Sequence, residues 1–226
     1  MSILQLHPYD ILPIRKRLGI SSEEFLEKYT YYHIDEKTSH IFVMLKTPCP
    51  FLKSGGCSIY TDRPFECRYF PVGVYFITKV LGKEVTCDVE YVLNLEEFCI
   101  GIHEDSEWTI ETWRTNQGID VFDDLYREWN EILLMADISG RYDKAQIYIV
   151  GYDLDRFRRF IFKSRFLDIV SIEEEEINKI KTNDTVLMKF GFKYLKHIFN
   201  IEKTLKLKEN NELQFEQIIR EIRQIR

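Results

Sequence analysis

Apolar side chains recur at helical spacing through the second half of the chain. In DVFDDLYREWNEILLMA (120–136) they lie three, four and one positions apart, the pattern of an amphipathic helix. YDLDRFRRFIFKSRFLDIV (152–170) and DTVLMKFGFKYLKHIF (184–199) repeat the pattern, and a terminal helix is predicted after a polar break at 209–212. The stripe expected to face the core in the first of these helices comprises Phe122, Leu125, Tyr126, Trp129, Ile132 and Leu133.

Before residue 120 the helical signals are shorter and have recognisable ends. HPYDILPIRKRLG (7–19) is predicted to be a helix that starts near Pro8, stops at Gly19 and is bent or restarted at Pro13. In SSEEFLEKY (21–29) a serine and a glutamate three residues apart form the capping box of a second helix. WTIETWRTNQG (108–118) predicts a third, capped by Thr109 and closed by Gly118.

Two segments are rich in β-branched and aromatic residues and predict strands. IFVMLK (41–46) is one, and VGVYFITKVLGKEVTCDVEYVL (72–93) is expected to form two strands joined by a turn at Gly82-Lys83. Together the elements predict an α+β fold. We expect a small mixed α/β cysteine-containing region at 1–118 and a mainly helical region at 119–226, packed on the first as one unit.

Composition narrows the functional classes. The chain has 226 residues, of which 45% are hydrophobic, so an ordinary globular core is expected. The net charge of −6 argues against nucleic-acid binding driven by the overall charge of the protein. The start MSILQLHPYD is not typical of a signal peptide, and no apolar run reaches membrane-spanning length. We therefore expect a cytoplasmic protein with no membrane partner, whose odd count of five cysteines stays reduced.

The segment CPFLKSGGCSIYTDRPFECRYFP (49–71) carries three of the five cysteines. Cys49, Cys57 and Cys67 lie in loop and turn settings, where thiolates can converge on an ion without disturbing regular backbone pairing. Their spacing is wider than the C-x2-4-C that opens most zinc sites, so burial as small apolar side chains stays an alternative. Cys87 alternates with polar residues in a predicted strand, and we expect it to be a core residue.

Arg63 and Arg68 bracket the third cysteine of this segment. Their guanidinium groups would donate hydrogen bonds to bound thiolates and offset their charge, or else form ion pairs with a neighbouring aspartate or glutamate. Cys99 lies in a later glycine-containing loop, FCIGIHEDSEWT, and is a candidate fourth ligand. His103, four residues further on, is an imidazole alternative to it.

The cysteine segment closely resembles the YkgJ-like or CxxCxxCC family of zinc- or iron-chelating domain proteins. The family pattern is matched by Cys-Pro-Phe-Leu, then Gly-Cys-x-Ile-Tyr, then Arg-Pro-x-x-Cys-Arg-x-Phe-Pro. LHPYDILPIRKRLGISSEEFLEKYT, FCIGIHEDSEWTIETWRTNQG, YDLDRFRRFIFKSRFL and FGFKYL are similar to other parts of the family, so the resemblance extends from Leu6 to His197. It implies a ligand set of Cys49, Cys57, Cys67 and Cys99, with Cys87 outside it.

One feature of the family is missing from this chain. A CxxCxxCC cluster normally precedes the segment equivalent to LQLHPYDIL, whereas the first cysteine here is Cys49. Either the true start lies upstream, or half of the thiolates are lost and the remaining four form a single site. In either case we expect metal loss to loosen 47–72 and 97–105 and to leave the C-terminal helices folded.

Three functions follow as hypotheses. The first is a cysteine-cluster protein that binds zinc or iron, the latter as an ion or an iron–sulfur cluster, without catalysis of its own. The second, implied by the resemblance, is an iron–sulfur-dependent enzyme, either an oxidoreductase or similar to protein lysine methylases. No phosphate-binding glycine loop, dinucleotide fingerprint or HExxH motif adds to that case. The third is an interaction protein using DRFRRFIFKSRF, although its apolar residues are expected in the core and its arginines on a solvated face.

Overall fold

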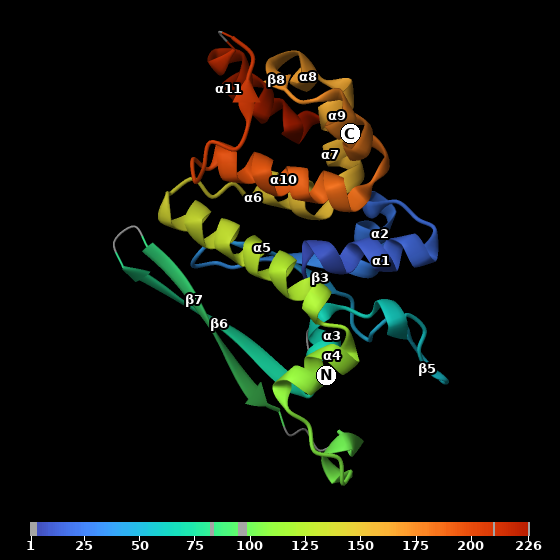
Figure 1. Cartoon of the computed structure of the whole chain (residues 1–226). Helices are drawn as coiled ribbons and strands as arrows, with labels where there is room; N and C mark the ends of the chain where they lie inside the picture. Colours follow the sequence, from blue (N-terminus) through green and yellow to red (C-terminus); the bar gives the residue numbers. More distant parts are fainter. Residues whose placement is uncertain (1–3, 82–83, 95–98, 210, 226) are drawn as a thin grey trace.

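The chain folds as α+β, which confirms the class predicted from its sequence. A computed structural model describes residues 4–81, 84–94, 99–209 and 211–225. Helices hold 57% of the chain and strands 15%, with small antiparallel sheets mainly in the first half and helices dominating the second. In Figure 1 the C-terminal helices form the upper part of the molecule and the cysteine-containing segments lie below them. No helix in the described part of the chain has the length and apolarity needed to cross a membrane.

A three-stranded antiparallel sheet and two helices make up the first part of the fold. The strands are β1 (Gln5–Leu6), β2 (Thr30–Ile34) and β3 (Ile41–Leu45), in the order β1-β3-β2. Helix α1 (Pro8–Leu18) runs through Pro13 without interruption and ends at Gly19, whose φ of 67° is the left-handed conformation that glycine adopts easily. Helix α2 (Ser22–Tyr29) begins where the Ser21 hydroxyl accepts a hydrogen bond from the Glu24 amide.

The second part of the fold contains the cysteine segment and a long hairpin. Strands β4 (Leu52–Lys53) and β5 (Gly56–Cys57) pair with each other and are followed by a 3₁₀ helix, η1 (Tyr60–Asp62), and by helix α3 (Phe65–Tyr69). Strands β6 (Val72–Leu81) and β7 (Glu84–Leu93) then form an antiparallel hairpin that extends away from the body of the molecule (Figure 1). The two strands confirm the prediction, whereas its turn at 82–83 lies outside the described residues.

Two helices connect this region to the C-terminal half. After a 3₁₀ turn, η2 (Ile100–His103), helix α4 (Ile110–Gln117) starts at Thr109, whose hydroxyl accepts from the amide of Thr112, and ends at Gly118. Helix α5 (Asp120–Ile138) follows directly. Its expected stripe is confirmed, because Phe122, Leu125, Trp129 and Ile132 are buried and Tyr126 and Leu133 are half-buried.

The C-terminal half has more elements than the sequence pattern indicated. Residues 152–170, expected to behave as one helical stretch, form two helices separated at Ser164 and Arg165, and the helix at 174–182 was not expected. The interior positions of the basic stretch are confirmed in part: Phe157, Phe160 and Ile161 are buried. The elements are α6 (Lys144–Ile147), a π-helix η3 (Tyr148–Tyr152), α7 (Leu154–Lys163), α8 (Phe166–Ile169), β8 (Val170–Ser171), α9 (Glu174–Thr182), α10 (Asp184–Ile198), β9 (Lys206–Leu207), α11 (Glu212–Glu221) and a 3₁₀ helix η4 (Ile222–Gln224).

The main core draws on both halves of the chain. It contains buried residues from Leu6 in β1 through to Ile222 near the C-terminus. A polar tie joins α2 to α7 at its edge, where the fully buried Ser22 hydroxyl donates to Asp153 at 2.9 Å and accepts from the Asp155 amide at 2.9 Å. Helix α4 ends at Gly118, which coincides with the expected division between 1–118 and 119–226. The main core contains residues from both regions, so the division into two regions stays a prediction.

Candidate functional site

The first two cysteines of the segment lie at the two ends of the β4–β5 hairpin. Leu52 donates its backbone N–H to the carbonyl of Cys49 at 3.2 Å and pairs across the hairpin with Cys57. Gly56 has a φ of 106°, which a side chain would disfavour, so the tight turn depends on glycine at this position. Cys49 is exposed and Cys57 is half-buried. The hairpin therefore presents two thiols at the surface on neighbouring backbone.

The third cysteine, Cys67, is the third residue of α3. Burial of its sulfur raises the pKa of Cys67 to about 12, and further increases come from the nearby charges of Asp10, Cys49, Cys57 and Glu66. Cys67 as a residue is exposed, but neighbouring groups surround its sulfur, and the loss of solvent there is the largest cause of the raised pKa. The three thiols thus lie close enough to influence each other electrostatically. Without a bound cation, Cys67 carries its proton at neutral pH.

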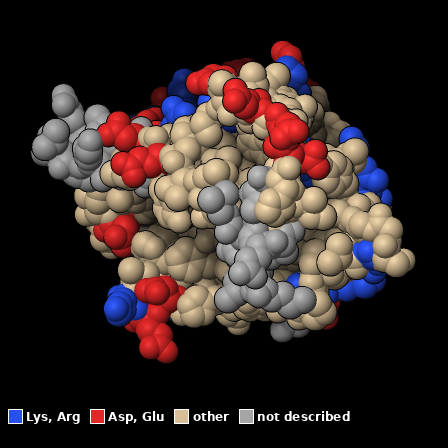
Figure 2. All heavy atoms as spheres, turned by 90° about the horizontal axis from the view of Figure 1, so that it is seen from below, with Lys and Arg blue, Asp and Glu red and all other residues tan. Residues whose placement is uncertain are grey.

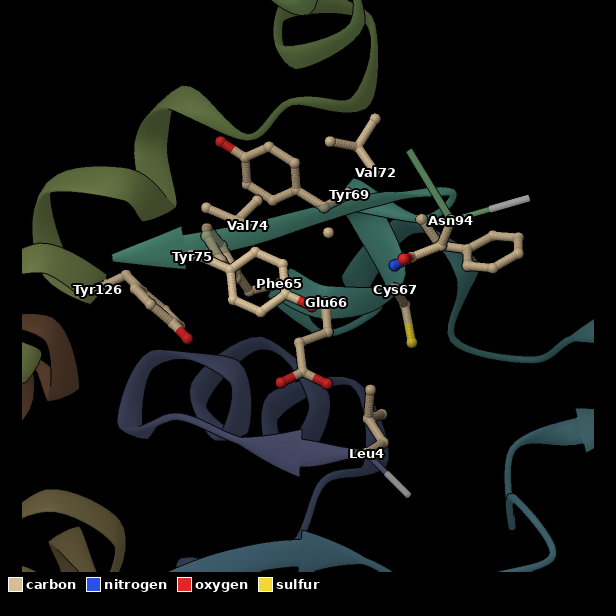
Figure 3. A pocket seen from close by; sticks show the side chains of 12 residues that line it. Leu4, Phe65, Glu66, Cys67, Tyr69, Val72, Val74, Tyr75, Asn94 and Tyr126 are labelled. Atoms are coloured by element: carbon tan, nitrogen blue, oxygen red, sulfur yellow. The ribbon is translucent and has the colours of Figure 1, made fainter. Parts of the chain in front are cut away.

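The side chain of Cys67 opens into a cavity of about 540 Å³. In Figure 3, Glu66 and Cys67 extend in the same direction, toward the segment that carries Leu4, and Tyr126 lies at the opposite end of the cavity. Burial raises the pKa of Glu66 to about 7, with a smaller contribution from the carboxylate of Asp10. A thiol and a carboxyl group that both resist ionisation therefore share one wall, and a cation would bind there only by displacing their protons.

Asp10 is hydrogen-bonded to the start of the helix that carries Cys67 and Glu66. Its carboxylate accepts hydrogen bonds from the backbone N–H of His7 at 2.8 Å and of Phe65 at 2.7 Å, and so links the start of α1 to the start of α3. Burial raises the pKa of Asp10 to about 6 despite these bonds. Sequence analysis did not single out Asp10, and it considered Glu66 only as an ion-pair partner of Arg63 or Arg68. The only local signal was an acidic residue in the first turn of a predicted helix, which is common and carries no information about a partner 55 residues away.

Arg63 and Arg68 are both buried, and the hydrogen bonds of their guanidinium groups go to oxygen atoms. Arg68 donates from Nε to the carbonyl of Arg63 at 3.0 Å, from Nη1 to that of Gln117 at 3.0 Å and from Nη2 to that of Thr61 at 2.6 Å. Arg63 donates to the carbonyl of Tyr60 and to the side chain of Gln117. The expected donation to sulfur is therefore not among the bonds of the described residues. Both arginines instead hold the backbone around Cys67 against α4.

Cys99 lies in the wall of a second cavity. This cavity, of about 860 Å³, is also lined by Trp108 and Trp113, whereas Cys67 lines the first one. Phe70 and Val72 contribute to both cavities and so stand between them. The fold consequently groups Cys49, Cys57 and Cys67 and places Cys99 on the other side of these two residues.

The described residues do not form a ready-made metal site. Across 4–81, 84–94, 99–209 and 211–225, no group of three or more histidine, cysteine, aspartate or glutamate side chains is arranged to hold a metal ion. His103, the imidazole alternative, is exposed in η2. Cys87 belongs to β7, and its side chain lies outside what the structure describes. The thiol neighbours are present, but they are not converged into a closed set of ligands.

Comparisons with known proteins give no independent assignment. No family model, no curated protein and no solved structure matches the chain. The resemblance of the cysteine segment to the zinc- or iron-chelating family thus stays a hypothesis that rests on the motif itself.

Proposed function

We propose that the protein binds zinc or iron through the cysteine segment, with Cys49, Cys57 and Cys67 as thiolate ligands and Cys99 as the fourth candidate. The observation that supports this most directly is the grouping of three thiols from the β4–β5 hairpin and α3 around one small region. Thiolate ligands suit zinc and iron–sulfur clusters alike, because both prefer soft sulfur donors. A bound ion would cross-link the hairpin to α3.

The proposed site has to close around its ion, because the described ligands are not converged. The hairpin is suited to such a movement, since β4 and β5 have two residues each and most of the segment between Leu52 and Gly56 is exposed. The α3 side is held more firmly by the three hydrogen bonds of Arg68. We therefore expect the hairpin, more than α3, to change on binding.

The test is the metal content of protein purified without oxygen, measured by elemental analysis for zinc and iron together with a visible absorption spectrum. Single serine substitutions at Cys49, Cys57 and Cys67 should each lower the content strongly, since removal of one ligand opens the site. Cys87→Ser is the matched control and should retain it. A wild-type protein that contains no metal and binds none on addition would overturn the proposal.

The role of the fourth cysteine is decided by the same series. Cys99→Ser should lose metal as completely as Cys67→Ser if the loop at 99–103 moves in to complete the site. If Cys99→Ser retains metal, the fourth ligand has to come from elsewhere, and Glu66 is a candidate because it lines the same cavity as Cys67.

Limited proteolysis distinguishes a local role for the metal from a global one. A chain of this length buries a core without a metal cross-link, as the continuous cluster from β1 to η4 illustrates. Chelation should therefore expose 47–72 and 97–105 to cleavage while fragments from the C-terminal helices persist. Uniform degradation of the whole chain on chelation would contradict this local role.

A second candidate function is that of an iron–sulfur-dependent enzyme, either an oxidoreductase or an enzyme similar to protein lysine methylases. The observation that favours it is the cavity of about 540 Å³ beside Cys67, large enough to admit part of a substrate. Iron with a sulfur-to-iron absorption band that is lost in Cys67→Ser would support this alternative. Colourless zinc at about one ion per chain would argue against it.

A further inference from the structure

The cavity that contains Cys99 has walls of an unusual kind. It is lined by four aromatic side chains from separate elements: Phe70 at the end of α3, Tyr91 in β7, Trp108 before α4 and Trp113 within α4. Trp108 is 51% exposed and Phe70 is 37% exposed, although burial of such large apolar side chains would be favourable. Aromatic rings from four elements therefore surround an opening to solvent, which is the form of a binding cavity for a small molecule.

Two of these rings have their polar atoms hydrogen-bonded within the protein. The indole nitrogen of Trp113 donates to the carbonyl of Tyr69 at 3.0 Å, and the hydroxyl of Tyr91 is hydrogen-bonded to that of Tyr69. Tyr69 itself lies in the smaller buried cluster and donates to Asp123 at 3.2 Å. The indole nitrogen of Trp113 and the hydroxyl of Tyr91 are therefore satisfied within the protein and require no polar group from a ligand.

The charge at this cavity is of one sign. Glu104 is the charged residue among the described lining residues, and its carboxylate has no hydrogen-bond or ion-pair partner within the described part of the chain. Asp105 and Glu107 follow it in the same exposed loop. The nearest basic residue along α4, Arg114, is engaged by Asp120 and Asp123. Figure 2, which views the molecule from below, shows a run of acidic side chains beside a largely uncharged surface, with basic side chains mainly toward the rim.

We infer that this cavity binds a small organic cation with an alkylated ammonium head. Aromatic faces attract such a cation through their quadrupoles, and an unpaired carboxylate at the edge supplies the opposite charge. An anionic ligand would be repelled by the acidic loop, and a hydrated alkali-metal ion would gain little from aromatic walls. The inference goes beyond metal binding by the cysteine segment and does not depend on it.

Tryptophan fluorescence provides a direct assay. The chain has three tryptophans, of which Trp129 is 1% exposed in the main core, so a change on addition of ligand reports on Trp108 and Trp113. The probes are choline and its uncharged carbon analogue 3,3-dimethyl-1-butanol, at constant ionic strength and with sodium chloride as the blank. We expect saturable binding of choline with a Kd in about the millimolar range, at least about 5-fold tighter than that of the analogue.

Two substitutions separate charge from aromatic contact. Glu104→Gln should weaken choline binding about 3- to 5-fold and leave the analogue unaffected, because only the charged ligand senses the carboxylate. Glu107→Gln, in the same loop but not in the wall, is the matched control and should bind choline as the wild type does. Trp108→Leu keeps an apolar side chain and should reduce the preference for choline over its analogue.

Three results would overturn the inference. The first is the absence of a saturable fluorescence change with choline in the wild type. The second is equal affinity for choline and its uncharged analogue, which would make the cavity a site for neutral apolar ligands. The third is an equal loss in Glu104→Gln and Glu107→Gln, which would reduce the effect to the diffuse charge of the loop. Trp108 and Glu104 are exposed, so neither variant is expected to unfold the protein.

Discussion

His7 is a buried imidazole that should control how the stability of the protein responds to acid. The residue is 4% exposed, and neither ring nitrogen has a hydrogen-bond partner among the described residues. Its ring packs against that of Tyr126, with 4.0 Å between the centroids, and more loosely against Phe65. Burial lowers the pKa of His7 from its ordinary value of 6.5 to about 3. A charged imidazole is therefore strongly disfavoured in this position.

The sign of the effect follows from comparing the folded and unfolded chains. Below pH 6.5 the unfolded chain takes up a proton on His7, while the folded chain does not until the pH approaches 3. Stability contributed by the neutral ring is thus present above pH 6.5 and is lost as the pH falls. At about pH 4.5, two units below the unfolded pKa, the loss is about 2.7 kcal/mol at roughly 1.36 kcal/mol per unit.

Two buried carboxyl groups near the start of α1 act in the opposite direction. Burial raises the pKa of Asp10 to about 6 and that of Glu66 to about 7, so both hold protons more tightly in the folded chain. Their contribution is greatest below the unfolded pKa and is lost as the pH rises through 6 to 7. Acidification therefore stabilises the fold through these carboxyls and destabilises it through His7. The pH dependence of the stability of the wild type alone would therefore not reveal the contribution of His7.

The assay compares the wild type with His7→Phe. Phenylalanine keeps the backbone N–H that donates to Asp10 at 2.8 Å, so the carboxyl contribution is common to both proteins. The free energy of unfolding is measured by urea denaturation of metal-free, reduced protein at about pH 7.5 and about pH 4.5. The change between these pH values should be more favourable to His7→Phe by about 2.5 to 3 kcal/mol. Any packing difference that does not depend on pH cancels in this comparison.

Parallel pH profiles for the two proteins would refute this reasoning. His33→Phe is the control, since it removes an exposed imidazole from β2 and leaves the buried ring of His7 in place. If His7→Phe does not fold, NMR titration of the wild-type imidazoles provides a second test. One of the five histidines should keep a neutral ring down to about pH 4, and titration of all five above pH 5 would contradict the structure.

Two further substitutions test how the interior is packed and how the cysteine segment is held. Gly151→Ala should destabilise the fold by about 2 to 3 kcal/mol, because a Cβ there would overlap the ring of Trp129; Gly55→Ala, which meets nothing within 4 Å, should be nearly neutral in the same urea titration. Arg68→Lys should cost about 2 kcal/mol, because one ammonium group cannot replace three guanidinium donors to backbone carbonyls. Arg17→Lys, at an exposed ion pair, should change the stability by less than about 0.5 kcal/mol. Equal losses of stability in the two arginine variants would contradict the inference that Arg68 holds the backbone around Cys67.

Local signals in the sequence were sufficient for most of the elements. Thr109 begins α4 because its hydroxyl accepts a hydrogen bond from an amide in the first turn, and Gly118 ends it because glycine adopts the left-handed conformation easily. Both signals depend only on residues within one turn. Phe157 and Phe160 are buried because their spacing puts them on one face of any helix that forms there. The same apolar spacing did not predict the break at Ser164. The apolar pattern continues across it, while the Ser164 hydroxyl bonds to the carbonyl of Phe160 and accepts from the Phe166 amide.

The candidate site was predictable only as a list of cysteines. The motif indicated which thiols to examine, and the structure groups three of them and puts the fourth in another cavity. The motif suggested that Arg63 and Arg68 donate hydrogen bonds to sulfur, whereas both donate to backbone carbonyl groups. Nothing in the spacing of Arg68 indicates that Gln117, 49 residues away, receives one of its bonds.

The sequence by itself determined the fold class, the main helix ends and the identity of the thiols, since each of these depends on residues within a few positions of one another. Only the tertiary structure decided that Asp10 is hydrogen-bonded to the start of α3, that neither ring nitrogen of His7 has a hydrogen-bond partner among the described residues, and that Trp108 and Glu104 share a cavity with Cys99. These relations join segments tens of residues apart. They depend on how the elements close onto one core, because burial and hydrogen-bond partners are properties of the packed chain and not of any stretch of it.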